Sequence, residues 1–322
     1  MKKVLLTLSL FGTLLFTGCS KKNVTKEKWE SHVETDGLFK YEYIYEDDSR
    51  TIICSAKKNS TSEYEEYYKY YTLFDEDKYI LEDIEYVWST EDDEWVGEIK
   101  KVNTYSDDHK KNHQVIYEYS EDSDYFNWIW REEGQMDYEY KTIKGKDYVT
   151  VEIEYLGNVI WEKYEYSYDS KGNLKSYNEY SLNWTTKELE FYRTAKIEVK
   201  GNKETHNFYY ANNDSVCTYK EEYEFDEKNN QISESNYRNV DGTWTLISKS
   251  TDEYVNGKHM SHTDYWYEDG VEEINYKDEY EYLDDGYIQT TAYDGDDGEL
   301  KPFCKYKYLL DKFGNEVFLT YM

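Results

Sequence analysis

Two pairs of histidines have a spacing that could serve metal chemistry. His109 and His113 are four residues apart, and His259 and His262 are three apart, so either pair could bring two imidazoles to one ion on a suitable backbone. A zinc site needs further cysteine, histidine or carboxylate ligands, and neither pair has them at a diagnostic distance. We therefore expect ordinary loop or strand-end histidines and no bound metal.

An acidic loop at residues 294–299 has the composition of a calcium site. Asp294, Asp296, Asp297 and Glu299 are interleaved with glycines, and Ca²⁺ takes hard oxygen ligands at alternating loop positions. Gly298, however, stands where the third ligand should be, and no glutamate follows at the last ligand position of such a loop. We interpret the segment as a solvated turn.

Nucleophilic and acid–base catalysis have no clear candidates. Cys54, Cys217 and Cys304 are far apart, allow at most one disulfide, and stand beside no recognisable catalytic histidine motif, so we interpret them as unpaired. Glycoside hydrolysis needs a pair of carboxylates, but in a chain with 69 acidic residues the presence of such a pair does not indicate an enzyme. The sequence has no Gly-x-Ser-x-Gly, phosphate loop, dinucleotide fingerprint or His-Glu-x-x-His motif. We expect no enzyme and no cofactor.

Aromatic side chains are the best candidates for a binding surface. The chain has 40 Tyr, 11 Phe and 9 Trp, and the faces of Trp and Tyr stack on sugar rings and anchor protein interfaces. The alternative is that these rings form the core, because the chain is poor in Leu and Ile. The candidate binding tryptophans are Trp128, Trp130, Trp161, Trp184, Trp244 and Trp266.

The charge of the chain excludes nucleic acid as a partner. Acidic residues outnumber basic ones 69 to 38, which gives a formal net charge of -31, whereas a phosphate-binding groove needs clustered Lys and Arg. Such a charge usually indicates disorder, but an aromatic content of 19% supplies large buriable surfaces. We expect a folded acidic domain whose membrane contact is confined to an anchor.

The N-terminus has the features of a signal peptide. Lys2 and Lys3 precede an apolar run over residues 4–16, which is too short to span a bilayer comfortably. Residues 16–19, Phe-Thr-Gly-Cys, resemble the bacterial lipobox, with Phe16 where Leu is commoner. The resemblance implies cleavage before Cys19 and acylation of its sulfur, which makes residues 1–18 a lipoprotein signal peptide; the alternative is an ordinary secretory signal.

Residues 19–39 form the lipidated cysteine and a polar tether. The segment is rich in Lys, Asn, Thr and Glu, and Trp29 is its only large apolar residue before about residue 35. In lipoprotein sorting an Asp after the lipidated Cys is associated with inner-membrane retention, and residue 20 is Ser. The resemblance therefore favours the outer membrane or the cell surface.

The rest of the chain, residues 40–322, has the periodicity of β-strands. In residues 148–155, Val149, Val151 and Ile153 alternate with Glu152 and Glu154, which predicts a half-buried antiparallel strand with its carboxylates on the exposed face. We find no amphipathic helix longer than about two turns. The enrichment in Tyr, Thr and Val also favours β-strands.

The strands recur as a repeat. A Tyr-x-Tyr/Phe pair followed by a turn that contains Asp and Gly or Asn recurs with its second aromatic residue at Tyr168, Phe225 and Tyr282, at intervals of 57 residues, with degenerate copies upstream and a last copy at residues 306–315. In each copy the Asp and the Gly or Asn predict a turn with positive φ. These repeats resemble the tyrosine-aspartate repeats of RHS-type cell-surface proteins and the related repeats of lipoproteins from host-associated bacteria. The resemblance implies an elongated β-sheet or shell and no catalytic residue.

We therefore predict an all-β fold, an elongated antiparallel repeat sheet forming a meander, solenoid or open shell of tyrosine-rich hairpins, with a compact closed barrel as the alternative. The expected function is that of a membrane-anchored extracytoplasmic lipoprotein that presents a surface for binding or scaffolding. Two alternatives remain open: capture of glycans on aromatic platforms, and an immunity- or antitoxin-like role, since polymorphic-toxin systems also use short aromatic repeats.

Overall fold

The chain folds into one antiparallel meander of strands. The computed structural model describes residues 32–121, 128–211, 216–268, 270–296 and 299–322. The signal peptide, Cys19 and the tether up to residue 31 lie outside the described residues. Each described strand pairs with the next along the chain, from β1 to β21, so the prediction of an all-β elongated meander is confirmed. None of the described segments forms a helix able to cross a membrane.

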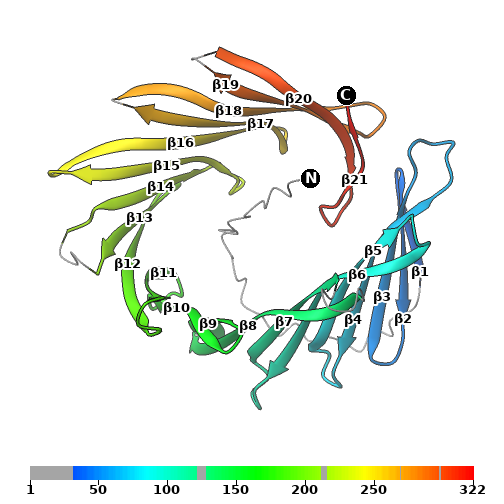
Figure 1. Cartoon of the computed structure of the whole chain (residues 1–322), viewed down its shortest axis with the longest axis horizontal. Coiled ribbons are helices and arrows are strands. Elements are labelled where there is room, and N and C mark those ends of the chain that lie inside the picture. Colours follow the sequence, from blue (N-terminus) through cyan, green and yellow to red (C-terminus); the bar gives the residue numbers. More distant parts are fainter. Residues whose placement is uncertain (1–31, 122–127, 212–215, 269, 297–298) are drawn as a thin grey trace.

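The strands curve steadily, so the sheet bends into a ring-shaped shell around a central opening (Figure 1). The strands are β1 (His32–Asp36), β2 (Phe39–Tyr45), β3 (Ser49–Ala56), β4 (Glu65–Phe74), β5 (Ile80–Ser89), β6 (Glu94–Tyr105), β7 (Lys111–Glu121), β8 (Trp128–Ile143), β9 (Lys146–Leu156), β10 (Val159–Tyr168), β11 (Leu174–Leu182), β12 (Leu189–Lys200), β13 (Lys203–Tyr210), β14 (Tyr219–Phe225), β15 (Gln231–Val240), β16 (Thr243–Val255), β17 (Lys258–Glu268), β18 (Val271–Tyr282), β19 (Ile288–Asp296), β20 (Glu299–Leu310) and β21 (Glu316–Tyr321).

The predicted turns take the expected form. Asp226 follows β14, and its carboxylate accepts hydrogen bonds from the backbone N–H of Lys228 and Asn230 at 2.8 Å and from the Asn230 side-chain amide at 2.8 Å. Asn229 adopts φ 67, and Gly172 adopts φ 92 at the equivalent position one repeat earlier. An Asp side chain therefore substitutes for backbone partners inside the turn, which is why Asp and a residue tolerant of positive φ recur together.

The 57-residue period corresponds to four strands. Tyr168 and Phe225 end β10 and β14, and Tyr282 ends β18, so each repeat contains two hairpins before the same turn recurs. Each strand contacts mainly its two sequence neighbours, as in other repeat folds. The repeat therefore sets the sheet's regular curvature without a second layer among the described strands.

The ring is closed by side chains and not by strand pairing. No pairing between β1 and β21 is found in the described residues, so the sheet is open in its hydrogen bonding and the closed barrel is wrong. Instead, the turn between β20 and β21, residues 311–315, lies against β2 and β4. The Tyr67 hydroxyl donates to Asp311 at 2.8 Å, the Tyr70 hydroxyl donates to Asn315 at 2.9 Å, and the backbone N–H of Lys312 donates to Tyr41 at 3.2 Å. We call these contacts the seam.

The buried core is concentrated at the seam. One cluster joins Ala56 of β3 to Leu309 and Val317 of the C-terminal hairpin, together with Tyr287. A second cluster joins Tyr41, Ile52 and Cys54, all at most 5% exposed. Because the first cluster combines β3 with the C-terminal hairpin, burial of apolar side chains supports closure where hydrogen bonds between strands do not.

The strand at residues 148–155 differs from the prediction in which face is solvated. β9 is a strand as expected, but Glu152 and Glu154 are half-buried, as are Val151 and Ile153. The register shifts opposite Tyr140, so Val149 lies on the carboxylate face and is 5% exposed. A β-bulge changes the parity of a strand, and the sequence alternation alone does not reveal it.

Candidate functional site

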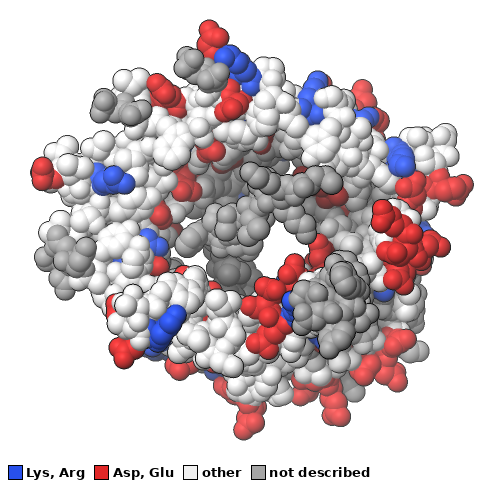
Figure 2. All heavy atoms as spheres, viewed as in Figure 1, with Lys and Arg blue, Asp and Glu red and all other residues white. Residues whose placement is uncertain are grey.

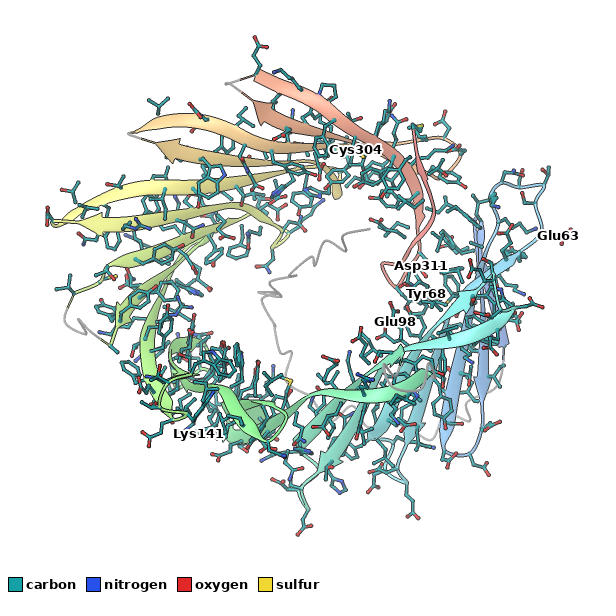
Figure 3. All side chains as sticks on the ribbon, in the orientation of Figure 1. Glu63, Tyr68, Glu98, Lys141, Cys304 and Asp311 are labelled. Atoms are coloured by element: carbon teal, nitrogen blue, oxygen red, sulfur yellow. The ribbon has the colours of Figure 1, made fainter. Side chains whose placement is uncertain are left out.

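The two faces of the sheet have different environments. Figure 3 shows Tyr68 and Glu98 on the concave side of the ring and Lys141 on the convex side. Successive residues of a strand point to opposite faces, so Tyr138 and Tyr140, on the same strand as Lys141, lie on the concave side. Cross-strand register then places Glu152, the partner of Tyr138, on that side as well.

A cross-strand row of tyrosines and charged groups crosses the concave face. Tyr138 of β8 lies opposite Glu152 of β9, and Glu152 lies opposite Tyr164 of β10. Tyr164 lies opposite Glu179 of β11, which lies opposite Arg193 of β12. The row therefore presents alternating aromatic rings and charges to the hollow side of the shell.

Three carboxylates of this face stand together without a matching set of cations. Glu154 lies directly opposite Glu162 across β9 and β10, two residues from Glu152. No lysine or arginine of the described residues forms a salt bridge with Glu152, Glu154 or Glu162. Like charges directly opposite each other destabilise a strand pair, so this cluster, which we call the carboxylate patch, costs the fold free energy.

Burial raises the pKa of two carboxylates of the patch, Glu152 and Glu154. Burial, followed by the charges of Glu162 and Glu152, raises the pKa of Glu154 to about 7. Burial also raises the pKa of Glu152, where the nearby Lys111 acts in the opposite direction. Lys111 itself lies over the ring of Tyr138, with its Nζ 4.7 Å from the ring centroid. The Tyr164 hydroxyl donates to Glu162 at 2.5 Å.

Further along the same row, Glu179 is a carboxylate whose charge is paired with a cation. Arg193 Nε donates to Glu179 at 2.6 Å, and the two side chains are 15% and 9% exposed. The guanidinium also lies 4.4 Å from the ring centroid of Phe208. Here the chain supplies one cation, held between a carboxylate and an aromatic face. The carboxylate patch likewise combines carboxylates with aromatic rings, and Lys111 is the one nearby cation among the residues that the structure describes.

Further carboxylates extend the negative character of the concave face. Burial and the charge of Glu85 raise the pKa of Glu98 on β6. On β14, burial raises the pKa of Glu221, with Glu234 among the charges acting in the same direction. Acidic side chains are visible beside the central opening of the shell in Figure 2. The carboxylate patch is therefore the central member of a series that follows the curve of the sheet.

The convex face carries a repeated pairing of lysine and tyrosine. Lys69 lies directly opposite Tyr86, with its Nζ 4.0 Å from the ring centroid. Lys220 lies opposite Tyr237 at 4.3 Å, and Lys163 one period earlier lies opposite Tyr180 at 5.4 Å. Several of these lysines also pair with a carboxylate two residues on, as in Lys163 and Glu165 at 2.6 Å. These three lysines are thus held by contacts within the sheet.

The tryptophans proposed as binding residues do not form one platform. Trp161 and Trp184 lie together, with ring centroids 5.2 Å apart, and Trp184 is 55% exposed. Trp130 packs on Tyr119 at 5.1 Å, and Trp266 is 58% exposed on another strand.

Trp244 and Trp128 belong to neither of these pairs. Trp244 lies under Lys220, whose Nζ is 5.2 Å from its ring centroid. The side chain of Trp128 lies outside the described residues.

The histidines and cysteines occupy ordinary structural positions. His259 and His262 share Asp252 at 2.8 and 2.9 Å, and His262 also contacts Asp264 at 3.1 Å, so hydrogen bonds to Asp252 and Asp264 raise the pKa of His262 to about 10.

His113 lies 2.7 Å from Asp137, and His109 stacks on Tyr79. The three cysteines are free, with Cys54 buried and Cys217 and Cys304 half-buried. Within the described ranges no group of three potential metal ligands is found, and Asp297 and Gly298 of the acidic loop fall outside those ranges.

Sequence reasoning missed the carboxylate patch and the lysine–tyrosine pairs. The signal for the pairs is the recurrence of Lys163, Lys220 and Lys277 at 57-residue intervals, in register with the tyrosine repeat. The patch has no such signal, because Glu154 and Glu162 meet only through the turn between β9 and β10 and the bulge beside it.

Comparisons with known proteins find solved structures that resemble this chain in fold, with low TM-scores. No known protein family matches the chain, and no curated protein matches its sequence. A protein of unknown function from Bacteroides fragilis is 14% identical, with a TM-score of 0.27, over 48% of this chain and 91% of that one. A porin-like protein from Bacteroides uniformis is 9% identical, with a TM-score of 0.32, over 90% and 99%. TcdB2-TccC3-TEV is 10% identical, with a TM-score of 0.25, over 88% and 19%. The chain is thus similar to other solved structures at a level that assigns no function.

Proposed function

We propose that the chain is a lipid-anchored, extracytoplasmic binding protein without catalytic activity. The observation that carries the proposal is the carboxylate patch on the concave face, where Glu152, Glu154 and Glu162 stand together at a cost to stability. Charged groups that lower the stability of the fold, with no interaction that offsets the loss, are typical of binding sites. A curved sheet whose concave face carries unpaired carboxylates is suited to holding a ligand on that side.

The anchor is the second part of the proposal. Residues 1–18 and Cys19 have the pattern of a lipoprotein signal and its lipidation site. Metabolic labelling with an alkyne-bearing palmitate should label the wild-type protein, and Cys19→Ser should abolish the label. Cys217→Ser is the matched control and should leave labelling unchanged. Equal labelling of wild type and Cys19→Ser would contradict the anchor.

Orientation of the anchored protein is tested on intact cells. We expect an outer-membrane or surface position, so added protease should remove the mature chain while a periplasmic marker survives. Protection of the chain until the envelope is breached would instead give a protein that faces the periplasm, and the search for its ligand would then be confined to that compartment.

Capture of glycans is a second candidate, favoured by the pair of Trp161 and Trp184. Trp184 is 55% exposed and lies beside Trp161, and exposed indole faces stack on sugar rings. If this pair binds a glycan, polysaccharide will quench tryptophan fluorescence in the wild type and in Trp266→Ala, but not in Trp184→Ala. Equal quenching in both variants would exclude the pair as the platform.

A further inference from the structure

The concave face is a sheet face that no described strand covers. Its cross-strand rows combine tyrosines with carboxylates, and the charge of the chain is -31. Around the patch, Glu152, Glu154 and Glu162 are accompanied by the rings of Tyr138 and Tyr164. A ligand for this surface has to bring positive charge, because a neutral or anionic ligand would leave the carboxylates desolvated and unpaired.

We propose that the concave face binds a lysine- or arginine-rich peptide segment of another protein, with its central contact at Glu152, Glu154 and Glu162. This inference rests on the proposed binding function and names the class of its ligand. A basic side chain would lie between the opposed carboxylates and the tyrosine rings, where it would gain both ion pairing and a cation–π contact.

The sheet already contains a version of this contact. Arg193 lies between Glu179 and the ring of Phe208 on β12 and β13, at 2.6 Å from the carboxylate and 4.4 Å from the ring centroid. Lys111 makes the aromatic part of this contact, with its Nζ 4.7 Å from the ring centroid of Tyr138. The tyrosines and carboxylates of the patch therefore match what this fold uses to hold a cation, with the ligand in place of Arg193.

The distribution of the carboxylates favours a peptide over a small cation. The pairs Glu85 and Glu98 on β5 and β6, and Glu221 and Glu234 on β14 and β15, flank the patch on β9 and β10. Neighbouring strands are about 4.8 Å apart, so these groups are separated by roughly 20 Å of sheet on each side. An extended chain with several basic residues can engage more than one group, whereas a single small cation engages one.

The experiment measures binding of a fluorescent nona-arginine peptide to the full-length protein in detergent, at fixed ionic strength. We expect saturable binding that is weakened about tenfold by Glu154→Gln, since a charge-assisted contact is lost. Glu139→Gln is the matched control, because Glu139 is exposed on β8 beside Tyr138 and lies on the convex face. It removes the same charge and should leave the affinity unchanged.

Each other outcome overturns the proposal in a distinct way. Equal weakening by Glu154→Gln and Glu139→Gln would mean that the peptide senses only the net charge. Absence of saturable binding to the wild type would exclude basic peptides as ligands. Full competition by spermine at matched ionic strength would assign the patch to small polycations. If palmitate labels Cys19 in any of these cases, the anchored role stands and only the ligand class fails.

Discussion

Closure of the shell depends on Asp311, and the repeat provides the control for testing this. Asp311 is 6% exposed. Its carboxylate accepts three hydrogen bonds within its own turn, from the backbone N–H of Phe313 and Asn315 and from the Asn315 amide, each at 2.8 Å. It accepts a fourth from the Tyr67 hydroxyl at 2.8 Å. Asp226 has the three turn bonds and no bond of the fourth kind among those found in the described residues.

Comparing the two Asp→Ala substitutions therefore separates the contribution of the seam to stability from that of the turn. A hydrogen bond to a charged group contributes about 1.5–3 kcal/mol, so Asp311→Ala should reduce the free energy of unfolding by about 2 kcal/mol more than Asp226→Ala does. In a double-mutant cycle with Tyr67→Phe, the coupling energy should be about 1.5–2 kcal/mol at position 311. Tyr67→Phe should show no coupling to Asp226→Ala, because the two sites share no partner.

The assay is equilibrium unfolding in urea, followed by tryptophan fluorescence and by far-ultraviolet circular dichroism. Agreement of the two signals justifies the two-state treatment on which the cycle depends. A coupling energy between Tyr67 and Asp311 within about 0.3 kcal/mol of zero would refute the reasoning, since independent sites add to within that margin. The shell would then be open at the seam in solution.

Three further predictions concern the two faces of the sheet. The pKa of Glu154 is raised to about 7 from 4.5, so the folded state binds more protons than the unfolded state between these values and stability falls as pH rises through them. Glu154→Gln should therefore leave stability unchanged near pH 4 and raise it at pH 8 by about 1–2 kcal/mol, a figure reduced for solvent screening, as measured by urea midpoints. Arg193→Met should cost about 3 kcal/mol by leaving Glu179 unpaired, while the double variant with Glu179→Leu should recover most of that loss. Gly97→Ala should cost about 1–3 kcal/mol and shift tryptophan emission, because a Cβ there would lie 2.5 Å from the ring of Trp130.

The fold could be predicted from the sequence because its signals are local. Asp226 accepts hydrogen bonds from backbone groups two and four residues further along the chain, so the short motif around it is enough to predict the turn. The alternating tyrosines of each strand are likewise visible within a few residues of sequence. The choice between an open shell and a closed barrel was not local. It depends on contacts such as Tyr67 with Asp311, which join the two ends of the chain.

The candidate site was less predictable for a related reason. Glu154 and Glu162 meet across a turn whose flanking bulge shifts the register by one residue between Ile160 and Glu162. Such a shift changes which side chains share a face, and no residue type reports it reliably. The tryptophans are predicted from their residue type and their positions between the repeats, and the structure distributes Trp130, Trp244 and Trp266 over separate strands.

In this interpretation the convex face and the seam stabilise the fold, and the concave face serves binding. The convex lysines, such as Lys69 over Tyr86, and the seam around Asp311 supply satisfied contacts. The concave carboxylates at Glu154 and Glu162 supply repulsion. If the patch served the fold, neutralising it would weaken the protein. Our reasoning requires the reverse, namely that Glu154→Gln stabilises the shell above pH 7 and weakens its hold on a basic peptide, because a site kept for binding costs stability in the absence of its ligand.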